Sequence, residues 1–157
     1  MKTLKEFLKK IAFRYTPLVK PNYPYLIEPI QLATLINETE RLKDVEGCFC
    51  EVGVARGMTT RFLAEHIESQ KIEQKSIYYA IDTFDSFVED DLDYEVKKRG
   101  KKIRELRGFG YNSYKVWERN FSKYKFINPI QADCSKFDFN TILPIKLTFL
   151  DVDLYVP

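Results

Sequence analysis

The segment Cys48-Phe-Cys-Glu-Val-Gly53-Val-Ala-Arg-Gly57 decides the fold, because it joins a short apolar run to a glycine turn. Helical spacing of apolar residues resumes at Thr59 and continues to Ile67. Glycine allows a tight turn and lets the backbone approach a ligand closely. The free N–H groups of the first turn of the next helix then point toward the same ligand. The segment therefore predicts a strand, a ligand-binding turn and a helix.

Three more apolar runs follow, and each of them ends in an aspartate. They are Ile77 to Ile81 before Asp82, Phe126 to Ala132 before Asp133, and Ile145 to Leu150 before Asp151. Apolar runs that alternate with helical segments are typical of parallel strands with crossover helices on both faces of a sheet. We therefore predict an α/β protein with a Rossmann-like, doubly wound and mainly parallel sheet.

The acids lie where a doubly wound sheet binds its ligand, beyond the carboxyl ends of its strands. Asp82 can accept both hydroxyls of a ribose, and Asp133 can accept from the exocyclic amine of adenine. Glu51 can orient the glycine loop or meet a cationic group of the ligand. Any one of these acids can instead be a turn or cap residue. With Ala55 in the middle place of a three-glycine loop, the glycine signal alone is weak, so the acids carry the prediction of an adenosine pocket.

Three motifs in this order resemble the macrocin O-methyltransferase family of class I methyltransferases, which largely act on sugar hydroxyls. The motifs are Gly47 to Gly57, Ala80-Ile-Asp82-Thr-Phe84-Asp-Ser-Phe87, and Leu150-Asp151-Val-Asp153-Leu-Tyr155. The resemblance extends from Val45 to Pro157 and implies a complete Rossmann-like sheet with more strands than this chain supplies. Because the chain ends at Pro157, we expect a truncated sheet without its carboxyl-terminal strands, an exposed strand edge and a homo-oligomer.

The resemblance implies an enzyme that transfers a methyl group from S-adenosylmethionine to a hydroxyl of a sugar or a glycosylated small molecule. The glycine loop would hold the methionine part of this cofactor, Asp82 the ribose and Asp133 the adenine. The residues implied around the cofactor are Glu51, Gly53, Val54, Ala55, Arg56, Gly57, Thr59, Asp82, Thr83, Phe84, Asp133, Cys134 and Asp151.

The resemblance also implies a divalent metal, Mg²⁺, bound by Asp151 and Asp153 and completed by a pair of acids that the family places after a later strand. Such a metal would orient the acceptor hydroxyl and lower its pKa. The candidate catalytic residue that accepts the proton of this hydroxyl is Asp153 or a residue beyond Pro157. The later pair of acids lies outside this chain.

Two further segments are predicted outside the nucleotide-binding core. Residues 1–44 form a helical and connector region before the Rossmann-like domain of residues 45–157, and their first helix is amphipathic and basic. That helix can pack on the domain or on a second subunit, or it can lie peripherally on an anionic membrane. An insertion at about residues 88–110 carries acids first and bases second, which favours a lid over the cleft rather than a nucleic-acid patch. Its cations can meet an anionic acceptor such as a nucleotide-linked sugar.

The composition fits an ordinary globular protein: 45% of the 157 residues are hydrophobic, 31% are charged, and the net charge is +2. An odd number of cysteines, Cys48, Cys50 and Cys134, without a secretory signal predicts reduced thiols in a cytoplasmic protein. Cys48 and Cys50 are expected in the core, and His66 at a helix end rather than in the site.

Two alternative functions remain open at this point. A truncated chain can be a non-catalytic remnant that only binds the cofactor or oligomerises. A nicotinamide-binding oxidoreductase shares the fold and the acid after the second strand, although the Asp151-Val-Asp-Leu-Tyr155 ending disfavours it.

Overall fold

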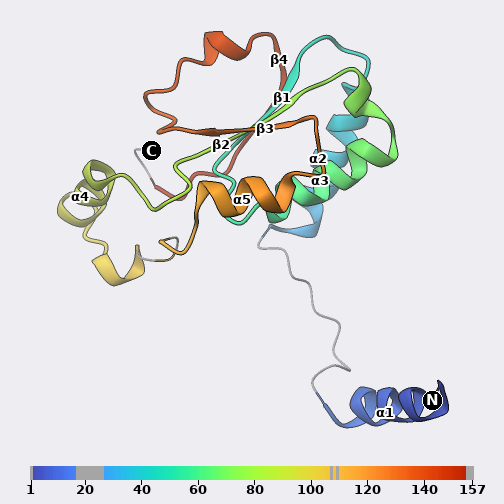
Figure 1. The fold of residues 1–157 in the computed structure, drawn as a ribbon. Helices are drawn as coiled ribbons and strands as arrows, with labels where there is room; N and C mark the ends of the chain where they lie inside the picture. Colours follow the sequence, from blue (N-terminus) through green and yellow to red (C-terminus); the bar gives the residue numbers. More distant parts are fainter. Residues whose placement is uncertain (1, 17–26, 107, 109, 155–157) are drawn as a thin grey trace.

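The computed structural model describes residues 2–16, 27–106, 108 and 110–154, and it contains a four-stranded parallel sheet with helices packed on it (Figure 1). The predicted α/β architecture is confirmed. In chain order the helices and strands are α1 (Lys2–Tyr15), α2 (Pro29–Arg41), β1 (Cys48–Val52), α3 (Met58–Ser69), β2 (Tyr78–Asp82), α4 (Glu89–Lys97), α5 (Tyr114–Phe121), β3 (Ile127–Gln131) and β4 (Ile145–Leu150). Short 3-10 helices cover Ile72–Gln74 (η2), Ile103–Glu105 (η3) and Phe139–Ile142 (η4).

The order of the strands is β3-β2-β1-β4, and every pair is parallel. Glu51 in β1 is therefore flanked by Ala80 of β2 and Phe149 of β4. β2 and β3 lie on one side of β1, and β4 lies on the other side. The sheet therefore has a topological switch point between β1 and β4, and doubly wound sheets bind ligands at such a point. All four carboxyl ends lie on the same edge of the sheet.

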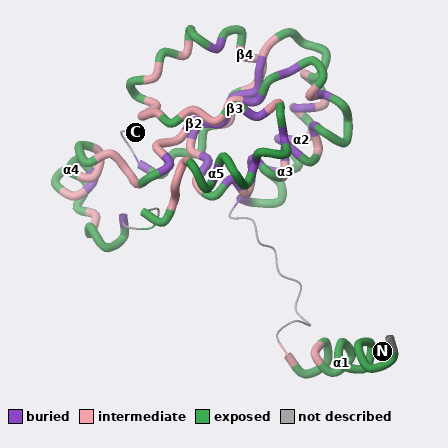
Figure 2. Tube along the Cα trace, in the orientation of Figure 1, coloured by how far each residue is buried: buried purple, intermediate pink, exposed green. Residues whose placement is uncertain are grey.

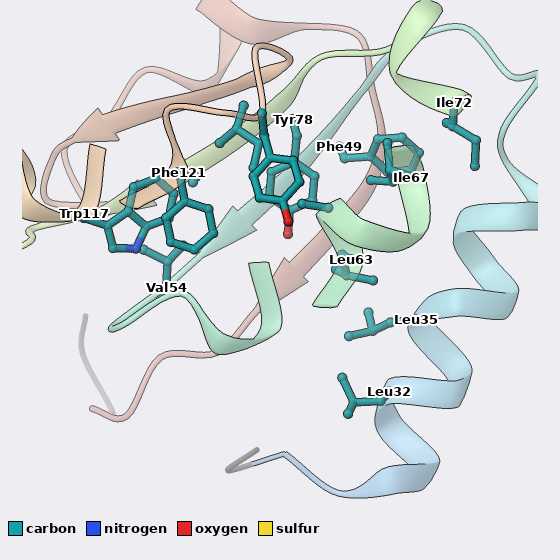
Figure 3. Close-up of a cluster of buried hydrophobic side chains, with 14 of the residues drawn as sticks. Leu32, Leu35, Phe49, Val54, Leu63, Ile67, Ile72, Tyr78, Trp117 and Phe121 are labelled. Carbon is teal, nitrogen blue, oxygen red and sulfur yellow. The ribbon is translucent and has the colours of Figure 1, made fainter. Parts of the chain in front are cut away.

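The two faces of the sheet are covered differently. On one face, side chains of α2, α3 and α5 pack against Phe49 and Tyr78 in a large apolar cluster (Figure 3). On the other face, Cys48 and Cys50 pack with Ile142 of η4 and the rings of Phe137 and Phe139. Both cysteines are thus core residues, as predicted, and the three cysteines of the chain are free thiols. Among the described residues, η4 is the helical element that contributes side chains to this second cluster.

The ends of the helices have local causes. Helix α2 begins at Pro29, whose missing N–H costs nothing at a first helical position, and the Gln31 side chain accepts from the Glu28 amide at 2.9 Å. Leu32 and Leu35 then bury the inner stripe of α2 in the large cluster. This helix precedes the predicted boundary at residue 44, which stays a prediction.

The charged insertion is not one continuous helix. Helix α4 ends at Lys97, and Gly100 follows in the left-handed region with φ of +70°. The carboxylate of Glu95 is fully buried and pairs with Arg99 at 3.0 Å and with Lys101 at 2.6 Å. These two ion pairs fold the chain back after α4, which periodicity alone does not predict.

Helix α1 stands apart from the sheet and is exposed along almost its whole length (Figures 1 and 2). The part of the chain that the structure describes contains no helix that is long and apolar enough to span a membrane.

Candidate functional site

A pocket of about 250 Å³ opens at the carboxyl ends of the strands. Its walls come from the turns after all four strands, together with the segment before α4 and the residues just before α5. The predicted residues that line it are Glu51, Gly53, Val54, Ala55, Arg56, Thr59, Asp82, Thr83, Asp133, Cys134, Asp151 and Asp153. The structure thus brings twelve predicted residues together around one hollow.

The pocket is strongly acidic. Seven of its lining residues are acids, whereas Arg56 is the only Lys or Arg among the described residues that line it. These carboxylates would repel an anionic group, whereas a cationic group would be attracted. The acids are Glu51, Asp82, Asp85, Asp91, Asp133, Asp151 and Asp153.

Asp82 organises the loop that follows β1. Its Oδ2 accepts from the amides of Val54 at 2.8 Å and Ala55 at 3.0 Å. Its Oδ1 accepts from the amide of Phe84 at 2.7 Å, whereas the Thr83 hydroxyl, 3.4 Å away, donates to the Ser86 carbonyl at 2.7 Å. A carboxylate offers about four acceptor positions, so this side chain is largely engaged by its own protein. A ribose at Asp82 stays a prediction, and it would have to share or replace one of these donors.

These bonds hold two residues in an unusual backbone conformation. Ala55 has φ of +44° and Phe84 has φ of +52°, values that non-glycine residues rarely adopt. Such conformations persist only where the surroundings fix them, and they collect at functional sites. The amides of both residues donate to Asp82. The carboxylate therefore fixes the two neighbouring turns after β1 and after β2, and both turns contribute residues to the pocket wall.

The side of the glycine loop that faces away from the pocket packs on aromatic residues of α5. Trp117 and Phe121 of α5 stack with ring centroids 4.0 Å apart, close to Val54 (Figure 3). A Cβ on Gly57 would lie 2.9 Å from Trp117 Nε1 and would collide with the Phe121 ring, so the loop closes only with glycine there. Gly57 and Phe84 are predicted cofactor contacts, but they are not among the lining residues. Phe84 is buried against Trp117 with centroids 5.2 Å apart, so both residues shape the loop from behind.

Glu51 lies at the floor of the pocket and is almost fully buried. Its Oε2 accepts from the hydroxyls of Thr60 and Tyr78, each at 2.6 Å. Burial raises the pKa of Glu51 from 4.5 to about 7, and the charges of Asp151 and Asp82 add to the rise, although the two hydroxyls oppose it. Glu51 therefore links β1, α3 and β2 as well as lining the site, and its role in orienting the loop stays a prediction.

The raised pKa of Glu51 predicts a pH-dependent stability. The folded chain holds this proton more tightly than the unfolded chain, so the stabilisation is complete below about pH 4.5 and is lost as the pH rises through about 7. A shift of this size corresponds to about 3 kcal/mol. We expect urea unfolding to show this loss in the wild type and not in Glu51→Gln. Free energies of unfolding that change in parallel with pH in both proteins would contradict the assignment.

Asp133 is held by its own turn after β3. Its Oδ1 accepts from the Ser135 amide at 2.9 Å and hydroxyl at 2.6 Å, and its Oδ2 pairs with Lys136 at 2.8 Å. The hydrogen bond with Lys136 is the first cause that lowers the pKa of Asp133, so it is an anion at neutral pH. Contact with an adenine amine stays a prediction for this residue.

Asp151 and Asp153 lie on the loop after β4. Burial raises the pKa of both carboxyls; the charge of Asp153 adds to the rise at Asp151, whereas Lys101 opposes it at Asp153. Asp151 and Asp153 supply two carboxylates, whereas the magnesium site that the resemblance implies also uses a further pair of acids. The described residues hold no group of three or more His, Cys, Asp or Glu side chains arranged for a metal ion. The residues present therefore do not fit the magnesium site that the resemblance implies. The motif's last residue, Tyr155, lies outside the described residues.

Several residues of the site were not predicted. The Asn112 side chain donates to the carbonyl of Ala55 at 2.7 Å, which ties the segment before α5 to the glycine loop. Tyr111, Asp85, Ser86 and Asp91 also line the pocket. Asp85 and Ser86 lie in the family motif from Ala80 to Phe87, and this position could have indicated that they belong to the site. Nothing local marks Asn112, because its partner is 57 residues away.

His66 has no place in the pocket. It lies in the last turn of α3, and its Nε2 is 2.8 Å from Glu40 Oε1 of α2. The prediction of a helix-end histidine is confirmed.

The family comparison agrees with this site. The chain matches the family model described as macrocin-O-methyltransferase (TylF) over residues 30–147. This span covers most of the chain and includes the glycine loop, Asp82 and Asp133. This family match identifies the chain as a methyltransferase of the O-methyltransferase type. The chain belongs to the macrocin O-methyltransferase family. Comparisons with curated proteins and with solved structures gave no match.

Proposed function

We propose that the chain binds S-adenosylmethionine in the acidic pocket and supports methyl transfer to a hydroxyl of a sugar or a glycosylated small molecule. The observation that carries this proposal is the acidic pocket at the switch point of the sheet, with its loop held by Asp82. Family membership gives the reaction class, and the chemistry of the pocket supports the cofactor.

The charge of the pocket favours this cofactor over a dinucleotide. S-adenosylmethionine has a sulfonium and an ammonium group, both of which suit a hollow lined by seven acids. A dinucleotide loop instead cradles a pyrophosphate with backbone amides and a helix N-terminus. Here the amides of Val54 and Ala55 already donate to Asp82, and Arg56 is the one Lys or Arg among the described lining residues. These features disfavour a nicotinamide-binding oxidoreductase.

In this proposal Asp153 is the residue of the chain that acts on the acceptor. When bound, the cofactor supplies an electrophilic methyl group on its sulfur. Asp153 would accept the proton of the acceptor hydroxyl, and the hydroxyl oxygen would take the methyl group that the bound cofactor supplies, leaving the sulfur as a neutral thioether. Burial raises the pKa of Asp153, which makes its carboxylate a stronger proton acceptor than an ordinary aspartate. Because the described residues do not fit a magnesium site, no step is assigned to a metal.

A turnover assay tests this function. We expect the chain, given S-adenosylmethionine and a panel of glycosides and nucleotide-linked sugars, to yield a singly methylated product detectable by mass spectrometry. Asp153→Asn should lower the rate about 100-fold or more, with binding of S-adenosylhomocysteine retained. Binding of the cofactor without turnover on any hydroxyl compound would instead support a non-catalytic binding module. An Asp153→Asn variant with the wild-type rate would remove Asp153 from the mechanism.

A further inference from the structure

The surface of α1 combines an apolar stripe with a basic remainder. Leu4, Phe7, Leu8, Ile11 and Tyr15 follow the spacing of three and four residues that puts side chains on one side of a helix. Their exposed fractions run from 42% for Ile11 to 78% for Tyr15, so this stripe is not buried by the rest of the chain. Figure 2 shows the same exposure along α1. An apolar stripe of this kind requires an occupant.

The charges around the stripe indicate which occupant it suits. Lys5 and Lys9 lie along one flank, and Lys10 and Arg14 lie along the other. Glu6 is the one acid of α1, and it pairs with Lys9 at 3.0 Å. The helix therefore presents an apolar strip between two rows of cations. This pattern suits a surface that is anionic at its boundary and apolar just beneath it.

We propose that α1 is a peripheral docking helix for an anionic lipid surface. The stripe enters the boundary between headgroups and acyl chains, and the flanking lysines and Arg14 meet the lipid phosphates. Long basic side chains reach headgroups while their stems cover apolar surface. The helix is too short and too charged to cross the bilayer, so it lies in the plane of the surface.

A second copy of this helix is a poorer occupant. Two α1 helices that faced each other through their stripes would bring the flanking cations of both copies together, and like charges across an interface are unfavourable. Their only acids, Glu6 of each copy, are already paired with Lys9. The charges that disfavour self-association favour an anionic lipid surface.

The chain contains a matched pair of residues for a test. Phe7 and Phe13 lie on the same helix with similar exposed fractions, 58% and 61%. Phe7 belongs to the stripe, whereas Phe13 projects from roughly the opposite side. Neither side chain contributes to the described core clusters, so replacing either one leaves the fold intact.

Co-sedimentation of the full chain with lipid vesicles tests the proposal. The protein should bind vesicles of phosphatidylcholine mixed with phosphatidylglycerol and should not bind phosphatidylcholine alone, and raised salt should release it. Phe7→Ala should weaken binding about tenfold, while Phe13→Ala stays near the wild type. Lys9→Glu with Lys10→Glu should remove the preference for anionic lipid.

Three outcomes would overturn it. One is no binding to either vesicle. Another is an equal loss in Phe7→Ala and Phe13→Ala, because the stripe would then have no special role. The third is an oligomer, seen by light scattering, that Phe7→Ala dissociates without any vesicle binding, because α1 would then dock on a second copy.

Discussion

Asp82→Ala is expected to weaken binding of S-adenosylhomocysteine at least about 100-fold. The substitution removes the acceptor of the Val54 and Ala55 amides and of the Phe84 amide. Hydrogen bonds to an ionised group contribute about 1.5–3 kcal/mol each, so the loss of two on the loop corresponds to this factor or more. Ala55 and Phe84 would then relax from their left-handed conformations, and the pocket would lose its shape. Isothermal calorimetry measures the effect.

A matched control separates this binding effect from a general loss of stability. Asp138 also caps a turn, with Oδ1 accepting from the Asn140 amide at 3.0 Å, but it lies at η4 outside the pocket. Asp138→Ala should therefore lower the unfolding midpoint and leave the affinity near the wild-type value. Asp82→Asn, which retains one carbonyl acceptor, should fall between the wild type and Asp82→Ala. Equal affinities for Asp82→Ala and Asp138→Ala would refute the role given to Asp82.

Gly53→Ala is expected to destabilise the fold by about 3 kcal/mol or more, a large part of the stability of a small domain. Gly53 has φ of +83°, and a Cβ there would collide with the carbonyl oxygen of Asp151 and lie 2.9 Å from its carbonyl carbon. Both are backbone atoms of the loop after β4, so no side-chain rotation relieves the contact. The Asp151 amide also donates to the Val52 carbonyl at 2.9 Å, which keeps the two loops close.

Gly100→Ala is the control for this prediction. Gly100 has φ of +70°, but nothing lies within 4 Å of a Cβ placed on it. This variant therefore carries only the cost of a left-handed alanine, about 1 kcal/mol. Urea unfolding of both variants isolates the cost of the contact at Gly53. Similar midpoints for the two proteins would show that the loops after β1 and β4 are not in close contact.

The positions of the four strands could be predicted from the sequence to within one residue at each end. Each strand is a short apolar run, and a polar residue or a glycine follows it closely, so local pattern and tertiary structure agree. The bounds of α5 could not be predicted in the same way. The run from Tyr111 to Tyr124 is apolar on one face throughout, yet α5 begins only at Tyr114. Asn112 holds the preceding segment against Ala55, and this contact is distant in sequence.

In the site, too, the positions of residues could be predicted from the sequence, whereas their contacts could not. The sequence places Glu51, Asp82 and Asp133 at strand ends, and the structure brings them to one pocket. What each carboxylate bonds to could not be predicted, because the partners are hydroxyls and amides of other elements. Thr60 and Tyr78 carry no motif, yet they determine the surroundings of Glu51. The sequence thus located the acids, and only the fold shows that Asp82 holds the loop.

The most direct test of the central proposal, that the acidic pocket binds the adenosyl cofactor, is a calorimetric titration of the wild-type chain with S-adenosylmethionine and S-adenosylhomocysteine. We expect saturable one-to-one binding of both ligands. The cationic S-adenosylmethionine should bind at least as tightly, because seven acids line the pocket. An excess of NAD should leave both titrations unchanged. Absence of binding by either adenosyl ligand, or displacement of these ligands by NAD, would contradict the proposal that this pocket binds the adenosyl cofactor.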